Sequence, residues 1–455
     1  MKAHVKQSIP LIAGAILAVV ALVICVPRPN YLISVLLMIG ALGAAVVSFS
    51  MWRDWFSPFS VMGTTWLLSL SISNLQLTNY FQEPWTLTTW FVLLASLGAF
   101  WCGCAPALLY AGRWPRMRST SWFATWCPRR IKRVIYGCLM TGGIGFAYQA
   151  MVAGNVPVLA HDPGLAKDTF QLPFIGYAFV LLVPASLLAY VYVELWGLRR
   201  NKAVAVSGIL AFLLLLAALA RVHPFFVLLV VFFARNMIRP WRLTWRKVFL
   251  IISFGLALLL LFSLIGDIRG NTLEGASAEE LVQQGRVDLP PVLVFPYLYV
   301  ASNFNNLQTT LQRNEELTLG LRTFLPVLGV LQLDQGLDLP TYRFGSGSLV
   351  ASTYLVDWYQ DFGMLGVLAI PFCLGLLSTW VYLKARTTGQ LVYVLLWGIV
   401  GACITLTVFS NFFSKTYVWY YVCLLMATHI YSRKRVPRRA PNRVDDGGLV
   451  RDGSS

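Results

Sequence analysis

The sequence predicts an all-α protein that crosses a membrane about twelve times, and three observations lead to this fold class. Of the 455 residues, 57% are hydrophobic and only 12% are charged, whereas a soluble globular protein has about 25% charged residues. Apolar blocks recur from one end of the chain to the other. Most of them are about 20 residues long, which is the length of helix that a bilayer core of about 30 Å requires.

Hydropathy, turn residues and charges divide the chain into four parts. Residues 1–266 hold nine predicted spans with short loops, and 267–362 form one large polar segment that lies outside. Residues 363–431 hold three more spans, and 432–455 form a basic cytoplasmic tail that we expect to be disordered. The predicted spans are 9–26, 31–51, 58–77, 86–109, 134–152, 173–193, 203–220, 224–238, 248–266, 363–383, 390–409 and 416–431.

Basic residues gather on one side of these spans. With the N-terminus inside, the inner side holds 27 of the 36 basic residues and 5 of the 19 acidic residues. The positive-inside rule therefore explains the net charge of +17 and places both termini in the cytoplasm. We attribute the basic tracts to topology and to contact with anionic membrane lipid, and we expect no nucleic-acid partner.

Loop lengths and span composition exclude other classes. The inner loops are too short to fold into a domain, and no GxxxxGK[ST] nucleotide motif occurs. No Asp, Glu, Lys or Arg lies in the middle of a predicted span. Because ion-coupled carriers usually need ionisable groups at the midplane, this argues against such a carrier, although it does not exclude a flippase. We expect any chemistry on the outer side.

Nine basic residues remain on the outer side, where they are disfavoured. Arg221 and Arg269 lie at span ends, where an unpaired guanidinium is costly to desolvate. We predict that both bind phosphate groups, which arginine forks can hold through two hydrogen bonds, rather than extend to lipid head groups. His223, in the turn beside Arg221, is either a hydrogen-bonded turn residue or a base that removes a proton.

Two stretches of the large outer segment are predicted to be interfacial helices. Residues 292–312 begin apolar and turn polar, and Gly320–Leu331 is apolar but interrupted by Pro326. Both are too short to span a bilayer, so we expect them to lie in the membrane interface. They would roof a cavity rather than form an independent domain.

A motif just before a late span carries a family resemblance. The residues Tyr359-x-Asp361-Phe362-Gly363-x-x-Gly366 resemble those of the bacterial oligosaccharide repeat-unit polymerases, the Wzy-type O-antigen polymerases. The chain departs from the family at Asn155-Val156, where glycine often precedes Ile-Pro, and at Lys167, where arginine is common. Shorter stretches resemble the family in the same order along most of the chain: Ser57-Pro58, Asn155–Pro157, Arg221, Tyr299–Leu307 and Gly320.

The resemblance implies a glycosyltransferase of the GT-C type in the bacterial inner membrane. Its donor would be an undecaprenyl-diphosphate-linked glycan, transferred at the periplasmic face to a hydroxyl group of a fresh lipid-linked repeat unit. The product would be O-antigen, a part of lipopolysaccharide, or a similar surface polysaccharide. A chain-length regulator and a flippase are partners that the family implies. Two alternatives stay open: an O-antigen-ligase-like transferase and a lipid-linked oligosaccharide flippase.

This reaction requires positive charge for the leaving diphosphate and a base for the acceptor hydroxyl group. The base is His223 or Asp361, and the sequence does not choose between them. Asp361 has a structural alternative, which is to cap a helix or to hold an arginine. The candidate diphosphate ligands are Arg221 and Arg269, with Arg322 or Lys415.

We expect no cofactor and a metal-independent reaction. The first outer loop, Pro27–Asn30, contains no acidic residue, and no DxD motif occurs in the chain. The eight cysteines match no zinc-site spacing. The glycines of the resembling region, Gly363, Gly366 and Gly375, are expected to provide a thin helix face for close packing instead of a chemical site.

Overall fold

The structure of the protein is a computed structural model. It describes residues 29–52, 54–78, 82–111, 126–161, 175–219, 222–239, 289–313, 316–330 and 351–433, and the single residues 166, 170, 253, 282 and 333. The described residues are mainly helical and contain no β-strand. The helices are α2 (Pro29–Trp52), α3 (Pro58–Asn74), α4 (Leu87–Ala111), α5 (Pro128–Ala153), η1 (Pro157–Leu159), α7 (Ile175–Val180), α8 (Leu182–Trp196), α9 (Lys202–Ala217), α10 (Val222–Ile238), α13 (Pro291–Arg313), α14 (Leu321–Val330), α15 (Leu355–Thr388), α16 (Leu391–Leu406), η2 (Phe412–Ser414) and α17 (Thr416–Ser432).

The composition of these helices is that of a membrane protein. Among the described residues, four helical stretches are long and apolar enough to cross a bilayer: Asn30–Trp52, Leu87–Pro106, Ala178–Trp196 and Leu355–Thr388. The helices α9, α10 and α16 are also apolar but shorter. Helices occupy ten of the twelve ranges predicted as spans, and the other two, 9–26 and 248–266, fall outside the described residues except for residue 253. The total of twelve spans and the GT-C-like fold stay predictions.

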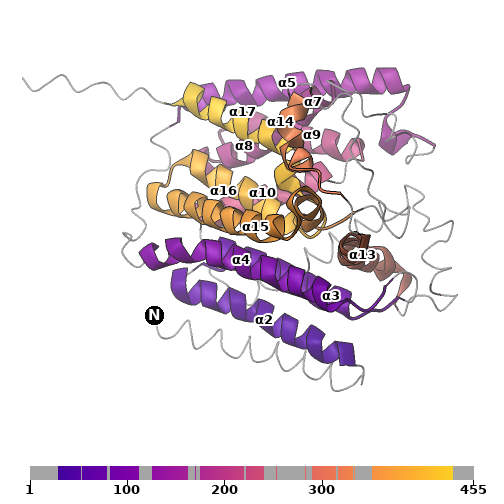
Figure 1. Cartoon of the computed structure of the whole chain (residues 1–455). Coiled ribbons are helices and arrows are strands. Elements are labelled where there is room, and N and C mark those ends of the chain that lie inside the picture. Colours follow the sequence, from indigo (N-terminus) through magenta and orange to yellow (C-terminus); the bar gives the residue numbers. More distant parts are fainter. Residues whose placement is uncertain are drawn as a thin grey trace, which may run out of the picture.

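The helices pack into a layered bundle. Figure 1 shows α2, α3 and α4 on one side, α10, α15 and α16 in the middle, and α5, α8, α9 and α17 on the other side. Large apolar side chains point away from the bundle; Leu365 on α15 is 71% exposed and Ile144 on α5 is 65% exposed. In water such a surface would be unfavourable, whereas lipid tails solvate it.

Glycines allow α4 and α15 to approach closely. A Cβ atom added to Gly375 would lie 2.1 Å from the carbonyl oxygen of Phe100, and one added to Gly103 would lie 2.0 Å from that of Phe372. A Cβ atom on Gly366 would meet the carbonyl oxygen of Trp358 at 2.2 Å. The prediction of close packing between helices is therefore confirmed for Gly375, whereas Gly366 lies against the preceding turns of its own helix, α15.

For Gly363 the packing prediction is wrong. This residue has φ 59° and ψ −143°, a backbone conformation that only glycine adopts readily, and it divides α15 into two helical segments. An added Cβ atom there would meet only the side chain of Leu317, at 3.9 Å. Gly363 therefore sets the path of the backbone and does not provide a packing surface.

The first predicted interfacial stretch forms helix α13, but its surroundings differ from the prediction. Helix α13 packs against α3, α4 and α15, and both its apolar and its polar side chains are largely buried. The indole of Trp85 donates to Asn305 Oδ1 at 3.0 Å, and the backbone N–H of Thr86 donates to Gln308 Oε1 at 3.0 Å. These hydrogen bonds stabilise buried side-chain amides, whereas the sequence predicts that this helix lies in the membrane interface.

The second stretch forms helix α14, which has an exposed apolar surface. Leu321, Phe324 and Val327 are 37%, 58% and 49% exposed. These residues recur at helical spacing, so they share one face of α14. The same helix contacts α15, α17 and η2. Helix α14 is thus attached to the bundle while its apolar face stays open, as expected of a helix at a membrane surface.

Candidate functional site

The carboxylate of Asp361 lies at the beginning of α14. Asp361 is fully buried, and its Oδ1 atom accepts the backbone N–H of Arg322 at 3.1 Å. Its Oδ2 atom accepts the backbone N–H of Thr323 at 2.6 Å and the hydroxyl group of Thr323 at 2.5 Å. The hydroxyl group of Thr318 also donates to Oδ1. Both carboxylate oxygens therefore accept hydrogen bonds from the start of a helix that lies about 40 residues earlier in the chain.

The contacts of Asp361 fit the structural role predicted as an alternative, in which this residue caps a helix. Capping was expected for the helix that contains Asp361, whereas the helix that it caps is α14. The negative charge of the carboxylate also compensates for the positive end of the α14 dipole. No local pattern could have identified Thr318 and Thr323 as partners, because the pairing depends on the fold. The alternative that Asp361 is a base stays a prediction.

Arg322 and Lys415 belong to elements that contact each other. Arg322 is the second residue of α14, and its side chain is mostly buried, with the whole residue 6% exposed. Lys415 is exposed and lies between η2 and the first residue of α17. Helix α14 packs against both η2 and α17, and Figure 1 shows it beside α17. Two candidate diphosphate ligands therefore lie at the same end of the bundle.

His223 lies in the first turn of α10 and faces α17. Its Nδ1 atom is 3.2 Å from the hydroxyl oxygen of Tyr421, and either atom can be the donor. The imidazole packs edge-on against the ring of Tyr417, with 5.1 Å between ring centroids, and against that of Phe179, at 6.2 Å. These contacts fix the position of the imidazole and fit both predicted roles, a hydrogen-bonded residue and an oriented base.

Each of these candidate residues, or the helix that carries it, adjoins or contacts α17. Lys415 directly precedes α17, Tyr417 and Tyr421 of α17 contact His223, and α14 with Arg322 packs against it. We define this group of His223, Arg322, Lys415 and Tyr421 as the α17 site. Arg221 and Arg269, the two other candidate ligands, lie outside the described residues, so their predicted place in the site is untested.

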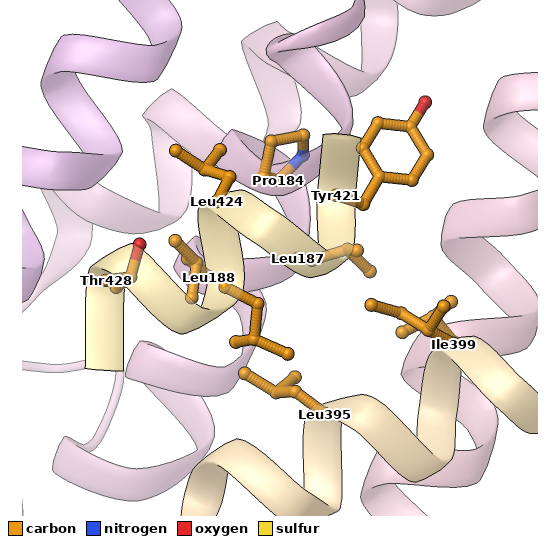
Figure 2. Close-up of a pocket in the computed structure, with 10 residues that line it drawn as sticks. Pro184, Leu187, Leu188, Leu395, Ile399, Tyr421, Leu424 and Thr428 are labelled. Atoms are coloured by element: carbon orange, nitrogen blue, oxygen red, sulfur yellow. The ribbon is translucent and has the colours of Figure 1, made fainter. Parts of the chain in front are cut away.

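A small apolar cavity lies beyond the α17 site. Figure 2 shows Tyr421 and Thr428 at two ends of its wall, with leucine and isoleucine side chains between them. Its lining comes from α8, α10, α16 and α17 and is almost entirely apolar. A sugar or a diphosphate needs polar partners, so we interpret this cavity as a gap in helix packing and not as a substrate site.

The comparisons with known proteins give no family. No family model matches the chain, and no curated protein or solved structure is similar to it. Within the described part of the chain, no group of three or more His, Cys, Asp or Glu side chains is placed to hold a metal ion. The fold and composition thus define the class of this protein, a helical membrane protein.

Proposed function

We propose that the protein is a glycosyltransferase that polymerises undecaprenyl-diphosphate-linked repeat units into O-antigen or a similar polysaccharide. It would act at the periplasmic face of the bacterial inner membrane, with about twelve spans and both termini in the cytoplasm. The observation that carries the proposal is that the elements bearing Arg322 and Lys415 contact α17, the helix whose Tyr421 also orients the imidazole of His223. The resemblance of Tyr359–Gly366 to the repeat-unit polymerases supports the same conclusion.

The chemistry assigns a role to each group. A base removes the proton of the acceptor hydroxyl group, whose oxygen then bonds to the anomeric carbon of the donor glycan. The bond between that carbon and the diphosphate breaks, and undecaprenyl diphosphate leaves with the electron pair. Arg322 would hold the diphosphate of the donor before and during transfer, and Lys415, with Arg221 and Arg269, would stabilise the negative charge that develops on the leaving group. His223, held by Tyr421, is our preferred base, with Asp361 as the alternative.

A deletion strain tests the proposed function. Loss of a polymerase should leave single repeat units attached to the cell surface. Loss of a flippase should leave none, and loss of a ligase should leave polymer that is not joined to its lipid A acceptor. A chain-length ladder like that of the parent strain would contradict the proposal. The strain should recover its ladder with the wild-type gene but not with a His223→Gln variant of equal abundance.

A reconstituted assay separates the enzyme from its partners. Purified protein in vesicles, given one defined lipid-linked repeat unit, should produce a ladder of longer lipid-linked glycans. A flippase would instead move the repeat unit across the bilayer without lengthening it. The chain-length regulator and the flippase that the family implies are absent from this assay, so a ladder would show that polymerisation belongs to this chain.

A further inference from the structure

Two segments far apart in sequence form one structural unit, which we name the Asp361 clamp. One segment is Thr318–Thr323, at the start of α14, and the other is Gln360–Gly363, at the bend of α15. Besides the four hydrogen bonds to the carboxylate, the backbone N–H of Thr318 donates to the carbonyl oxygen of Gln360 at 2.8 Å. The clamp therefore connects α14 to α15 through both side chains and backbone.

Helix α14 depends on Asp361 because it has no cap of its own. The carbonyl oxygen of Gly320 accepts the first helical hydrogen bond, from the backbone N–H of Phe324 at 2.9 Å, so Gly320 occupies the N-cap position. Glycine has no side chain that can accept the free N–H groups of the first turn. Asp361 accepts two of them. A helix of only 10 residues is marginally stable without such support.

Glycines shape both segments of the clamp. Gly320 has φ 94°, and a Cβ atom added to it would lie 3.0 Å from the ring of Phe362. Gly363, with φ 59°, directly follows Phe362 and turns the backbone away. The residue before Phe362 is Asp361, so these two backbone conformations bring the carboxylate to the N-terminus of α14. The motif Tyr359–Gly366 thus has a structural explanation: it positions Asp361 at the N-terminus of α14.

We propose that Asp361 is a positioning residue: it holds the first turn of α14 so that Arg322 binds the leaving diphosphate. The proposal rests on the function proposed above. Asp361 holds Arg322 by its backbone N–H, and the guanidinium follows the position of that turn. Both oxygens of Asp361 accept bonds from Thr318, Arg322 or Thr323. A carboxylate engaged in this way orients its neighbours, whereas a base must reach the acceptor hydroxyl group.

The hydroxyl group of Thr323 allows a test that leaves the carboxylate in place. Thr323→Val removes one donor to Asp361 with little change in shape, and Arg322→Lys keeps the charge but loses the guanidinium fork. If Asp361 positions Arg322, both variants should raise the KM for the lipid-linked donor about tenfold and change kcat less than about twofold. Their double variant should show less than the product of the two effects, because both changes act on one interaction.

A threonine elsewhere on α15 provides the control. The hydroxyl group of Thr387 donates to the carbonyl oxygen of Leu383 in the same helix, at 2.8 Å, far along the chain from the clamp. Thr387→Val should leave KM and kcat as in the wild type. A purely structural role of Thr323 would reduce the amount of active protein, and hence the apparent kcat, without changing KM.

A role of Asp361 as the catalytic base predicts different kinetics. If Asp361 were the base, Asp361→Asn would lower kcat about 100-fold to 10,000-fold, and Thr323→Val would have a wild-type KM. That pair of results would overturn the proposal. Asp361→Asn should instead act mainly on KM, as Thr323→Val does, and with a larger effect.

Hydrogen exchange separates this proposal from the proposed function. In wild-type protein in detergent, the amides of Arg322 and Thr323 should exchange slowly, and Asp361→Asn should speed their exchange at least about tenfold. Exchange in α4 should stay unchanged. If the purified protein makes no polymer but shows this exchange pattern, the proposed function fails while the clamp stands. If the two amides exchange equally fast in both proteins, the clamp itself is refuted.

Discussion

Tyr382 donates its hydroxyl hydrogen to Oδ2 of Asp54 at 2.8 Å, which joins the last turns of α15 to the loop between α2 and α3. The Oδ1 atom of the same carboxylate accepts the side-chain amide of Asn236 on α10 at 3.0 Å. The guanidinium of Arg386 lies 3.8 Å from Oδ2 and donates to the hydroxyl oxygen of Tyr382 at 2.7 Å. One carboxylate therefore holds three parts of the bundle together, at the end that the charge distribution predicts to be cytoplasmic.

We expect Tyr382→Phe to lower the free energy of unfolding by about 1–2 kcal/mol, because it removes a buried hydrogen bond and keeps the ring. Asp54→Ala should cost more, about 3 kcal/mol, since it leaves Arg386 without its carboxylate. Thermal unfolding in detergent, followed by circular dichroism, measures both. Tyr393→Phe is the control, because the hydroxyl group of Tyr393 makes no hydrogen bond to a described residue. Equal unfolding temperatures for all three variants would contradict the role of Asp54.

The crossing of α4 and α15 predicts opposite effects for two glycines of one helix. Gly103→Ala would place a methyl group 2.0 Å from a backbone oxygen of α15, so the helices must separate, at a cost of about 1–3 kcal/mol. A Cβ atom added to Gly98 would meet no described atom within 4 Å outside the backbone of its own helix, so Gly98→Ala should stabilise α4 by up to about 1 kcal/mol. Unfolding temperatures of the two variants should lie on opposite sides of the wild type. If Gly103→Ala is as stable as Gly98→Ala, the helices do not cross as described.

Part of this fold follows directly from local sequence. Long apolar blocks have one low-energy solution in a bilayer, the helix, so the ranges of α2, α4 and α16 agree with their predicted spans to within a few residues. Small residues at helix crossings are also a local signal, and Gly375 was recognised by it. Such features depend only on neighbouring residues in the chain and on the surrounding lipid, so they can be predicted without knowledge of the fold.

Other features depend on partners that are distant in sequence. The polar half of α13 resembles a surface helix until Trp85 and Thr86 supply hydrogen bonds for its amides. Asp361 was recognised as a possible cap, but its partner α14 could not be identified, because nothing local links residue 361 to residues 322 and 323. The sequence predicts a packing role for Gly363, because a glycine with a positive φ cannot be distinguished by sequence from a glycine that allows close packing.

The hydrogen bond between His223 and Tyr421 predicts graded losses of activity. His223→Gln should lower the rate of polymerisation about 100-fold to 10,000-fold, as expected when a base is lost. Tyr421→Phe keeps the ring that packs against Phe226 and removes only the hydroxyl group, so the loss should be smaller, about tenfold. The measurement is ladder formation by purified protein at equal protein amounts. Full activity of His223→Gln would remove this residue from the mechanism and leave Asp361 as the candidate base.

Chelation tests how the charge of the leaving diphosphate is compensated. Guanidinium and ammonium groups can stabilise that charge without an ion, and Arg322 and Lys415 lie on elements that meet at the start of α17. We therefore expect EDTA to leave the rate of ladder formation unchanged, and Arg322→Ala to lower it even when Mg²⁺ is abundant. Loss of ladder formation after chelation, restored by Mg²⁺ alone, would contradict this expectation. It would mean that acidic groups elsewhere in the chain bind a metal ion, and that this ion, together with the cationic side chains, stabilises the charge of the leaving diphosphate.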